Sequence, residues 1–178
     1  MRKSSIALIG FMGAGKTEVG KALAKKLNKK FVDLDPLIEQ KVGKSIPEIF
    51  REDGEVAFRE LEIEATRELS QAKNLVIACG GGIVLNQINI ERLREQSVIV
   101  YLVASPQLLL KRALSGEPRP LLETENQAAT IRELLEFRKP FYKRAADIKV
   151  DTSKLDIGAV VQRIIAELEK DESFNFQK

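Results

Sequence analysis

The sequence predicts an α/β fold of three layers, with helices on both faces of a five-stranded parallel sheet. Short apolar runs alternate along the chain with segments whose apolar residues recur at helical spacing. Most of these runs are apolar at successive positions, which is typical of strands buried on both faces. A length of 178 residues with 44% hydrophobic side chains suits one core. Residues 1–178 are therefore predicted to form a single domain.

The five predicted strands are short runs that stop at turn-forming or polar residues. In chain order they lie at residues 5–10, 31–33, 75–79, 97–103 and 148–150. The second ends in acidic residues, and the third ends at three consecutive glycines. Ligands of parallel sheets bind beyond the carboxyl ends of the strands. Motifs at these ends are therefore candidate site residues.

The predicted helices lie between the strands and follow from apolar spacing and capping signals. In chain order they lie at residues 16–27, from 45 to about 54, 55–70, 86–96, from 105 onward, 127–144 and 157–170. Ser45 and Glu48 form a capping box at the start of the second helix. Pro140 is expected to end or kink the helix at 127–144. Residues 115–126 are expected to form a loop, and 171–178 a frayed tail.

Composition excludes several kinds of site. The chain has no histidine and one cysteine, Cys79, which excludes histidine-based catalysis, an internal disulfide and a multi-cysteine zinc site. The net charge of +3 suits a small anionic ligand, and no concentrated basic stripe points to nucleic acid. No apolar run approaches the ~20 residues that a membrane span needs. With one cysteine and no signal-peptide pattern, we expect a cytoplasmic protein.

Residues 10–17, Gly-Phe-Met-Gly-Ala-Gly-Lys-Thr, match the phosphate-binding pattern G-x-x-x-x-G-K-[S/T]. The pattern stands between a buried strand and an amphipathic helix, which is the context it requires. Backbone amides at Gly13, Ala14 and Gly15 are expected to face the phosphates of a nucleoside triphosphate such as ATP. Lys16 should reach the β- and γ-phosphates, and the Thr17 hydroxyl should bind Mg²⁺. The alternative is a plain glycine turn with an exposed lysine.

Two further candidates follow the second and third strands. Asp33 and Asp35 lie one residue apart at a strand end, where a kinase needs a carboxylate near the attacking hydroxyl and the metal. Otherwise they are ordinary loop residues, with Asp35 capping a helix at Pro36. The glycines at 80–82 would let a ligand approach bare backbone, and the alternative there is a tight turn.

Three arginines are candidates for anion binding. Arg59 lies on a helix three residues before Glu62, which can hold its guanidinium, although a solvated ion pair is a common alternative. Arg138 falls on an apolar stripe and therefore needs a partner, for which an anionic ligand is one candidate. Arg119 lies in the proline-rich loop and suits a lid over the transferred phosphate. Its alternative is a solvated loop residue.

Taken together, these motifs resemble those of shikimate kinases over nearly the whole chain. The matching segments are residues 10–17, 33–35, 45–50, 54–62, 80–82, 119–122 and 138–142. The resemblance implies a P-loop, nucleoside-monophosphate-kinase-like fold with a substrate-binding region at about 33–62 and a lid at about 114–126. It also implies ATP- and Mg²⁺-dependent phosphorylation of the 3-hydroxyl of shikimate, in chorismate and aromatic amino-acid biosynthesis.

The resemblance also implies roles for individual residues. Lys16, Asp33 and Arg119 would be catalytic, and Arg112 would stack on adenine. Shikimate would be bound by groups from three parts of the chain: Asp35, Arg59, Gly81, Gly82 and Arg138.

Three alternatives remain open at this point. Gluconate-type kinases and nucleotide monophosphate kinases share the phosphate loop and the fold class. A catalytically silent nucleotide-binding module is the third. The pair Arg59 and Arg138 argues for a carboxylate substrate, and the intact Lys16 and Thr17 argue for catalysis. We expect a monomer with small-molecule substrates and no nucleic-acid partner.

Overall fold

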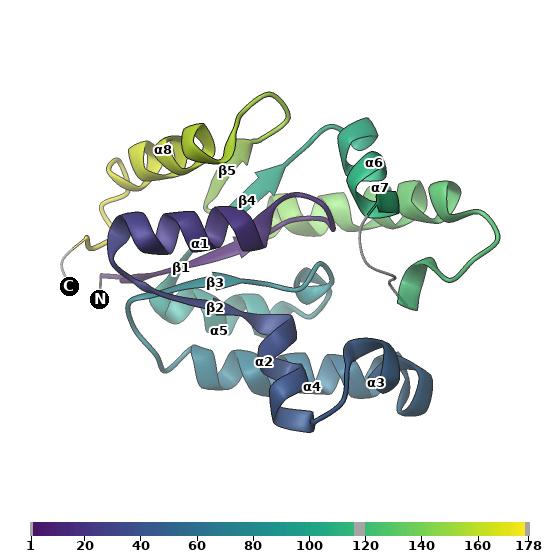
Figure 1. Ribbon diagram of the computed structural model, residues 1–178. Coiled ribbons are helices and arrows are strands. Elements are labelled where there is room, and N and C mark those ends of the chain that lie inside the picture. The colour runs from purple at the N-terminus through teal and green to yellow at the C-terminus, as the bar shows by residue number, and fades with distance from the viewer. Residues whose placement is uncertain (1, 116–119, 177–178) are drawn as a thin grey trace.

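A parallel five-stranded sheet forms the centre of the molecule (Figure 1). The computed structural model describes residues 2–115 and 120–176. The strand order is β2-β3-β1-β4-β5, and each neighbouring pair is parallel. The strands are β1 (Ser5–Ile9), β2 (Lys30–Asp33), β3 (Leu75–Ala78), β4 (Ser97–Val103) and β5 (Ile148–Asp151). The predicted sheet is confirmed.

The central strands are apolar because both of their faces are covered. Every residue of β1 and β3 is buried, and β4 is buried except at its last residue. Figure 1 shows helices in front of the sheet and behind it. Helices α1 (Lys16–Leu27) and α8 (Ile157–Leu168) pack on one face, and α5 (Gln87–Gln96) and α7 (Gln127–Ala145) on the other. This is the three-layer arrangement that the alternation of elements predicts.

The remaining helices do not cover the centre of the sheet. They lie beside it, toward the end at which its strands have their carboxyl termini. Helix α4 packs against α2, α3 and α5, and α6 packs against α7. Their bounds are α2 (Leu34–Val42), α3 (Ile46–Glu52), α4 (Gly54–Leu69) and α6 (Pro106–Ser115), with 3₁₀ helices η1 (Ile83–Leu85) and η2 (Pro120–Leu122). No helix within residues 2–115 and 120–176 is long and apolar enough to cross a membrane.

Helix α2 was raised only in the alternative that has Asp35 capping a helix at Pro36. The helix begins directly after β2 and its N-cap residue is Asp33, so the capping role in that alternative is wrong: Asp35 lies within the first turn. Leu34 and Ile38, four residues apart, are its buried positions. The short length of the helix hid this weak periodicity. Residues 115–126, expected to be a loop, contain η2.

Two other expectations are corrected by the structure. Of the two effects expected of Pro140, an end or a kink, the first is wrong, because α7 continues to Ala145. A proline in a helix interior loses one backbone hydrogen bond, and packing along α7 offsets that cost, since Leu135, Tyr142 and Ala145 on both sides of it are buried. The tail is not frayed over its described part. Phe174 is 5% exposed and pairs with Lys3 in an isolated parallel bridge, two residues before β1 begins.

Candidate functional site

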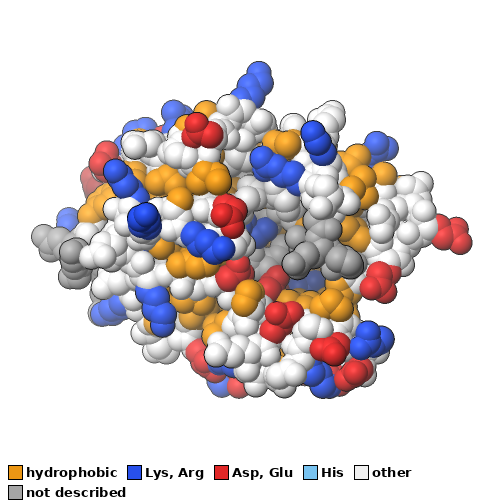
Figure 2. Space-filling view, viewed as in Figure 1, with side chains coloured by type: hydrophobic (Ala, Val, Ile, Leu, Met, Phe, Trp, Pro, Cys, Tyr) orange, Lys and Arg blue, Asp and Glu red, His pale blue; other side chains and the backbone are white. Residues whose placement is uncertain are grey.

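A cleft of about 470 Å³ opens at the carboxyl ends of β1, β2 and β3. Figure 2 shows the face on which it lies, with charged side chains of both signs gathered around a hollow. The phosphate loop forms one side, α3 and α4 form the opposite side, and the glycines after β3 and one face of α7 lie between them. Three of the sequence motifs therefore meet where the sheet topology places a ligand site.

The phosphate loop joins β1 to α1. Gly10, Gly13 and Gly15 have positive φ values of 152°, 80° and 91°, which favour glycine. These angles curl the backbone, and α1 begins at Lys16, so its N-terminal amides face the loop. Lys16 Nζ donates hydrogen bonds to the carbonyl oxygens of Gly10 at 2.8 Å and Phe11 at 3.0 Å. The loop therefore has the strand, turn and helix that the motif requires.

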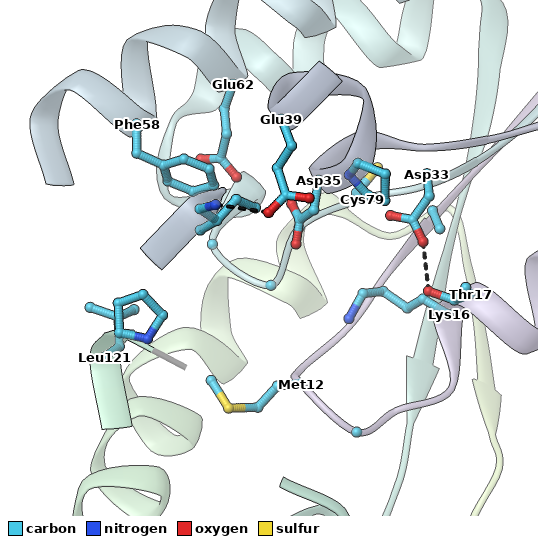
Figure 3. Close-up of a pocket in the computed structure, with 18 of the residues that line it drawn as sticks. Met12, Lys16, Thr17, Asp33, Asp35, Glu39, Phe58, Glu62, Cys79 and Leu121 are labelled. Atoms are coloured by element: carbon cyan, nitrogen blue, oxygen red, sulfur yellow. Dashed lines mark hydrogen bonds between the residues drawn. The ribbon is translucent and has the colours of Figure 1, made fainter. Parts of the chain in front are cut away.

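Thr17 and Asp33 lie side by side in the cleft (Figure 3). The Thr17 hydroxyl donates a 2.7 Å hydrogen bond to Asp33 Oδ2. Mg²⁺ prefers oxygen ligands and is commonly held by one or two protein oxygens plus substrate phosphates. One hydroxyl and one carboxylate at the phosphate loop fit that requirement. Within the described residues, no group of three carboxylate or cysteine side chains could hold a metal, so the substrate phosphates would have to supply further ligands.

Arg59 is held by two carboxylates of its own helix. Its Nη1 donates to Glu62 Oε2 at 2.6 Å, and its Nη2 donates to Glu55 Oε1 at 2.9 Å. The Arg59 side chain is 14% exposed and that of Glu62 is 0% exposed, so this is not a solvated surface pair. Burial raises the pKa of Glu62 above its ordinary value, although Arg59 opposes the shift.

Charged side chains of the cleft approach two of the glycines after β3 closely. A Cβ on Gly82 would lie 2.3 Å from Arg59 Nη1. A Cβ on Gly80 would lie 2.8 Å from Glu62 Oε1 and 2.9 Å from Asp35 Oδ1. A side chain at either position would have to displace the ends of these charged side chains, so the two glycines leave room for them. Gly80 and Glu62 were not among the predicted binding residues, because their closeness to Asp35 depends on how α2 and α4 pack.

Arg138 approaches the cleft from α7, on the other side of the triplet from Arg59. It is 3% exposed, and its Nε has no hydrogen-bond partner among the described residues. A Cβ on Gly81 would lie 3.6 Å from its Nη1. Arg59 and Arg138 thus bring two guanidinium groups to adjacent glycines. A planar carboxylate is the anion that such a pair binds best.

Not every predicted residue lines the cleft. Ala14 is buried within the loop, and Arg112 lies beside the loop, where its Nη1 donates to the Gly13 carbonyl oxygen at 3.0 Å. Arg119 lies outside the described residues. Cys79 lines the cleft but is 3% exposed, and burial raises the pKa of its thiol, so it is a packing residue as expected.

An apolar wall of the cleft was missed. Its side chains come from the phosphate loop, α3, α4 and η2, and they are Met12, Ile46, Phe50, Phe58 and Leu121. The rings of Phe50 and Phe58 pack with centroids 4.9 Å apart. Phenylalanine in an amphipathic helix is first attributed to the core, and Phe58 is indeed buried. The sequence carries no signal that the same face also closes a ligand site. The wall suits the hydrocarbon ring of a small substrate.

Comparison with known proteins agrees with this arrangement. A family model described as shikimate kinase matches residues 12–169. The shikimate kinase of Caldanaerobacter subterraneus subsp. tengcongensis is 47% identical over 90% of this chain and 94% of its own length. The solved structure of the shikimate kinase from Acinetobacter baumannii in complex with shikimate has a TM-score of 0.91 at 38% identity, covering 96% of this chain and 95% of that one.

A more distant structure is relevant to the alternative functions. A gluconokinase from Sinorhizobium meliloti 1021 matches with a TM-score of 0.58 and 16% identity, covering 94% of this chain and 92% of that one. At this identity the likeness concerns the fold alone.

Proposed function

This chain belongs to the shikimate kinase family and phosphorylates the 3-hydroxyl of shikimate with ATP, and we propose that one side of its cleft binds ATP and the opposite side binds shikimate. The products are shikimate 3-phosphate and ADP, and the reaction uses Mg²⁺. The enzyme is a transferase of the shikimate pathway, which leads to chorismate and the aromatic amino acids.

The phosphate loop would hold the triphosphate. In this proposal the amides of Gly13, Ala14 and Gly15 face the phosphate oxygens, and Lys16 exchanges its contacts with the loop carbonyls for the β- and γ-phosphates. Thr17 would hold Mg²⁺ with Asp33 beside it. When bound, the metal neutralises charge on the β- and γ-phosphates. We also infer that Arg112 stacks on adenine and that Arg119 closes over the phosphates.

The opposite side of the cleft would hold shikimate. Arg59 and Arg138 bind its carboxylate, and Asp35 accepts hydrogen bonds from its hydroxyl groups. The backbone at Gly81 and Gly82 would lie against the substrate, and at Gly82 a side chain would collide with the Arg59 guanidinium. Glu62 and Glu55 fix the Arg59 guanidinium before the substrate arrives, so less side-chain freedom is lost on binding.

Catalysis in this proposal is positioning together with charge neutralisation. The substrate hydroxyl oxygen forms a bond to the γ-phosphorus as the bond to the leaving ADP oxygen breaks. Asp33 takes the hydroxyl proton, and its carboxylate is placed for this by the end of β2 and by Thr17. Lys16 and Arg119 stabilise the negative charge that spreads over the transferred phosphate. No histidine is required.

One observation carries the assignment of the two sides. Arg59 and Arg138 reach neighbouring glycines of the triplet from α4 and α7, whereas Lys16, Thr17 and Asp33 lie at the phosphate loop. A carboxylate substrate needs the first set, and a nucleoside triphosphate needs the second. Gluconate also carries a carboxylate, but it lacks the compact ring that the apolar wall suits.

Turnover by matched lysine variants tests the proposal. Wild-type enzyme with Mg·ATP and shikimate should release ADP, and ³¹P NMR should show a phosphate ester at the 3-hydroxyl. Lys16→Ala should lower kcat by at least about a thousandfold while the chain stays folded. Lys21→Ala changes an exposed lysine of the same helix and should leave kcat unchanged. Normal turnover by Lys16→Ala would remove the phosphate-loop assignment.

We further propose that the enzyme acts as a cytoplasmic monomer without a nucleic-acid partner. The buried, free Cys79 suits a reducing compartment, in which ATP is also available. Sedimentation velocity at assay concentration should give one species near 19.9 kDa, the mass of one chain.

A further inference from the structure

The Tyr142 hydroxyl lies directly behind the side of the cleft assigned to shikimate. Tyr142 is 0% exposed and is not among the residues that line the cleft. Its Oη donates a hydrogen bond to the carbonyl oxygen of Gly81, 61 positions earlier in the chain. Gly81 does line the cleft. The hydroxyl thus ties α7 to the backbone of the glycine triplet.

Arg138 is the second neighbour of this hydroxyl. Arg138 and Tyr142 lie four residues apart on α7 and therefore on the same face of the helix. Burial raises the pKa of Tyr142, and Arg138 opposes that rise through its charge and a side-chain hydrogen bond. Gly81 and Arg138 also face each other, since a Cβ on Gly81 would lie 3.6 Å from Arg138 Nη1. The three groups are mutual neighbours.

The ring that carries the hydroxyl is held by the sheet. Tyr142 stacks on Tyr101 of β4, with ring centroids 5.1 Å apart and an angle of 22° between the ring planes. A stacked, fully buried ring has little freedom to turn its hydroxyl elsewhere. Its position is therefore fixed by β4 and α7, whether or not a substrate is bound.

From this geometry we propose that Tyr142 is a positioning residue for shikimate. Its hydroxyl holds the Gly81 backbone and the Arg138 guanidinium at the spacing that the substrate requires. Tyr142 itself contacts neither the substrate nor the transferred phosphate. The inference rests on the proposed function, specifically on the assignment of Gly81 and Arg138 to shikimate.

Steady-state kinetics of two matched variants test the proposal. Tyr142→Phe keeps the stacked ring and removes the hydroxyl, which leaves the carbonyl of the half-buried Gly81 without its donor. The KM for shikimate should rise about tenfold, while the KM for ATP and the kcat at saturation stay within about twofold. Tyr101→Phe removes a hydroxyl from the other ring of the stack and should leave the KM for shikimate within about twofold.

The pattern of constants separates the possible outcomes. A purely structural role for the hydroxyl would lower the melting temperature of Tyr142→Phe without raising the KM for shikimate, and that result overturns the proposal. Equal rises in both KM values also overturn it. A wild-type enzyme that releases no ADP with shikimate would instead contradict the proposed function.

Tyrosine NMR provides a second test that needs no Tyr142 variant. The chain contains two tyrosines, so labelling with [¹³Cζ]tyrosine gives two resonances, which Tyr101→Phe assigns. Saturating shikimate should shift the Tyr142 resonance more than that of Tyr101, and Mg·ADP alone should shift neither. A Tyr142 resonance that does not move with shikimate overturns the proposal, even if Tyr142→Phe fails to fold.

Discussion

Arg138 is a buried cation of the cleft whose hydrogen-bonding capacity is not filled by the described residues. A guanidinium that is 3% exposed has lost most of its water, and such a loss is costly unless a partner compensates it. The described residues offer its Nε no acceptor. A substrate carboxylate would supply one, together with the opposite charge. Burying the Arg138 guanidinium destabilises the unliganded protein, and binding of the substrate carboxylate offsets that cost.

Arg138→Lys tests this at the residue scale. Lysine keeps the charge but cannot bind a carboxylate in two places, so the KM for shikimate should rise at least about tenfold and the KM for ATP should not change. Arg132→Lys, an exposed arginine of the same helix, is the matched control for the kinetic assay. A loss of ATP affinity in Arg138→Lys would show that the carboxylate assignment is misplaced.

Glu62 should make stability depend on pH. Burial raises its pKa above the ordinary 4.5, so ionisation costs the native state free energy. The protonated Glu62 carboxyl is the form that the native state favours. Its contribution to stability is fully present below pH 4.5 and is lost as the pH rises through the higher native pKa. The free energy of unfolding of the wild type, relative to Glu62→Gln, should therefore fall as the pH rises above 4.5.

Urea unfolding at several pH values measures this difference. Glu60→Gln changes an exposed carboxylate of the same helix and should show no such trend. A difference between wild type and Glu62→Gln that stays constant with pH would contradict the buried ionisation.

The sequence identifies those functional residues that belong to a local pattern, such as a consecutive motif or a helical spacing. Lys16 and Thr17 follow from eight consecutive positions, and the Arg59–Glu62 pair follows from helical spacing. The glycine triplet was also recognised as a candidate, but the close neighbours of Gly80 and the role of Tyr142 could not be found in this way. Their partners lie on other elements, and only the packing of those elements brings them together.

At the scale of elements, the junction of β1 and the phosphate loop leaves no room for a side chain. Gly10 has a φ of 152°, and a Cβ there would lie 2.7 Å from the carbonyl oxygen of Leu102 in β4. Because that oxygen belongs to the backbone of a central strand, it cannot move aside cheaply. The loop can therefore leave β1 at this angle only with glycine.

Gly10→Ala should lower the free energy of unfolding by about 2 kcal/mol and abolish turnover, since the strained residue must displace the loop. Gly158→Ala in α8 is the matched control. Its Cβ would meet its nearest neighbour, Asp156 Oδ1, at an ordinary 3.4 Å. It should raise stability by at most about 1 kcal/mol. Urea unfolding measures both, and equal effects would contradict this account of the junction.

The strands and long helices were predictable because their apolar patterns are long or continuous. Helix α2 was not among the predicted helices, and a helix at Pro36 stood only as an alternative, because its two buried residues form a pattern too short to stand out. The continuation of α7 past Pro140 was missed because burial of Tyr142 and Ala145, which offsets the lost hydrogen bond, is tertiary. Both elements carry site residues, so local sequence rules fail where packing builds the cleft.

At the scale of the whole molecule, the cleft and the chain termini lie at opposite ends of the sheet (Figure 1). The carboxyl ends of β1, β2 and β3 border the cleft, and the C-terminal segment pairs with the residues just before β1 through Lys3 and Phe174. Phe174 is 5% exposed and lies 5.5 Å from Lys29 Nζ, measured from its ring centroid. This packing closes the end of the core that is remote from the chemistry.

Phe174→Ala should therefore separate stability from activity. It should lower the free energy of unfolding by about 3 kcal/mol and leave kcat and both KM values unchanged. Phe176→Ala, at a ring that is 41% exposed, should cost much less. A fall in kcat for folded Phe174→Ala would show that the two ends of the sheet are coupled.

The most direct measurement compares ADP release from Mg·ATP by the wild-type enzyme with three acceptors in one assay: shikimate, gluconate and AMP. A site built from Arg59, Arg138 and the apolar wall should turn over with shikimate and show only background release with the other two. Comparable release with gluconate or AMP would keep the phosphate-loop assignment and contradict the acceptor site. No release with any acceptor, from protein shown to bind ATP, would contradict the enzymatic function itself.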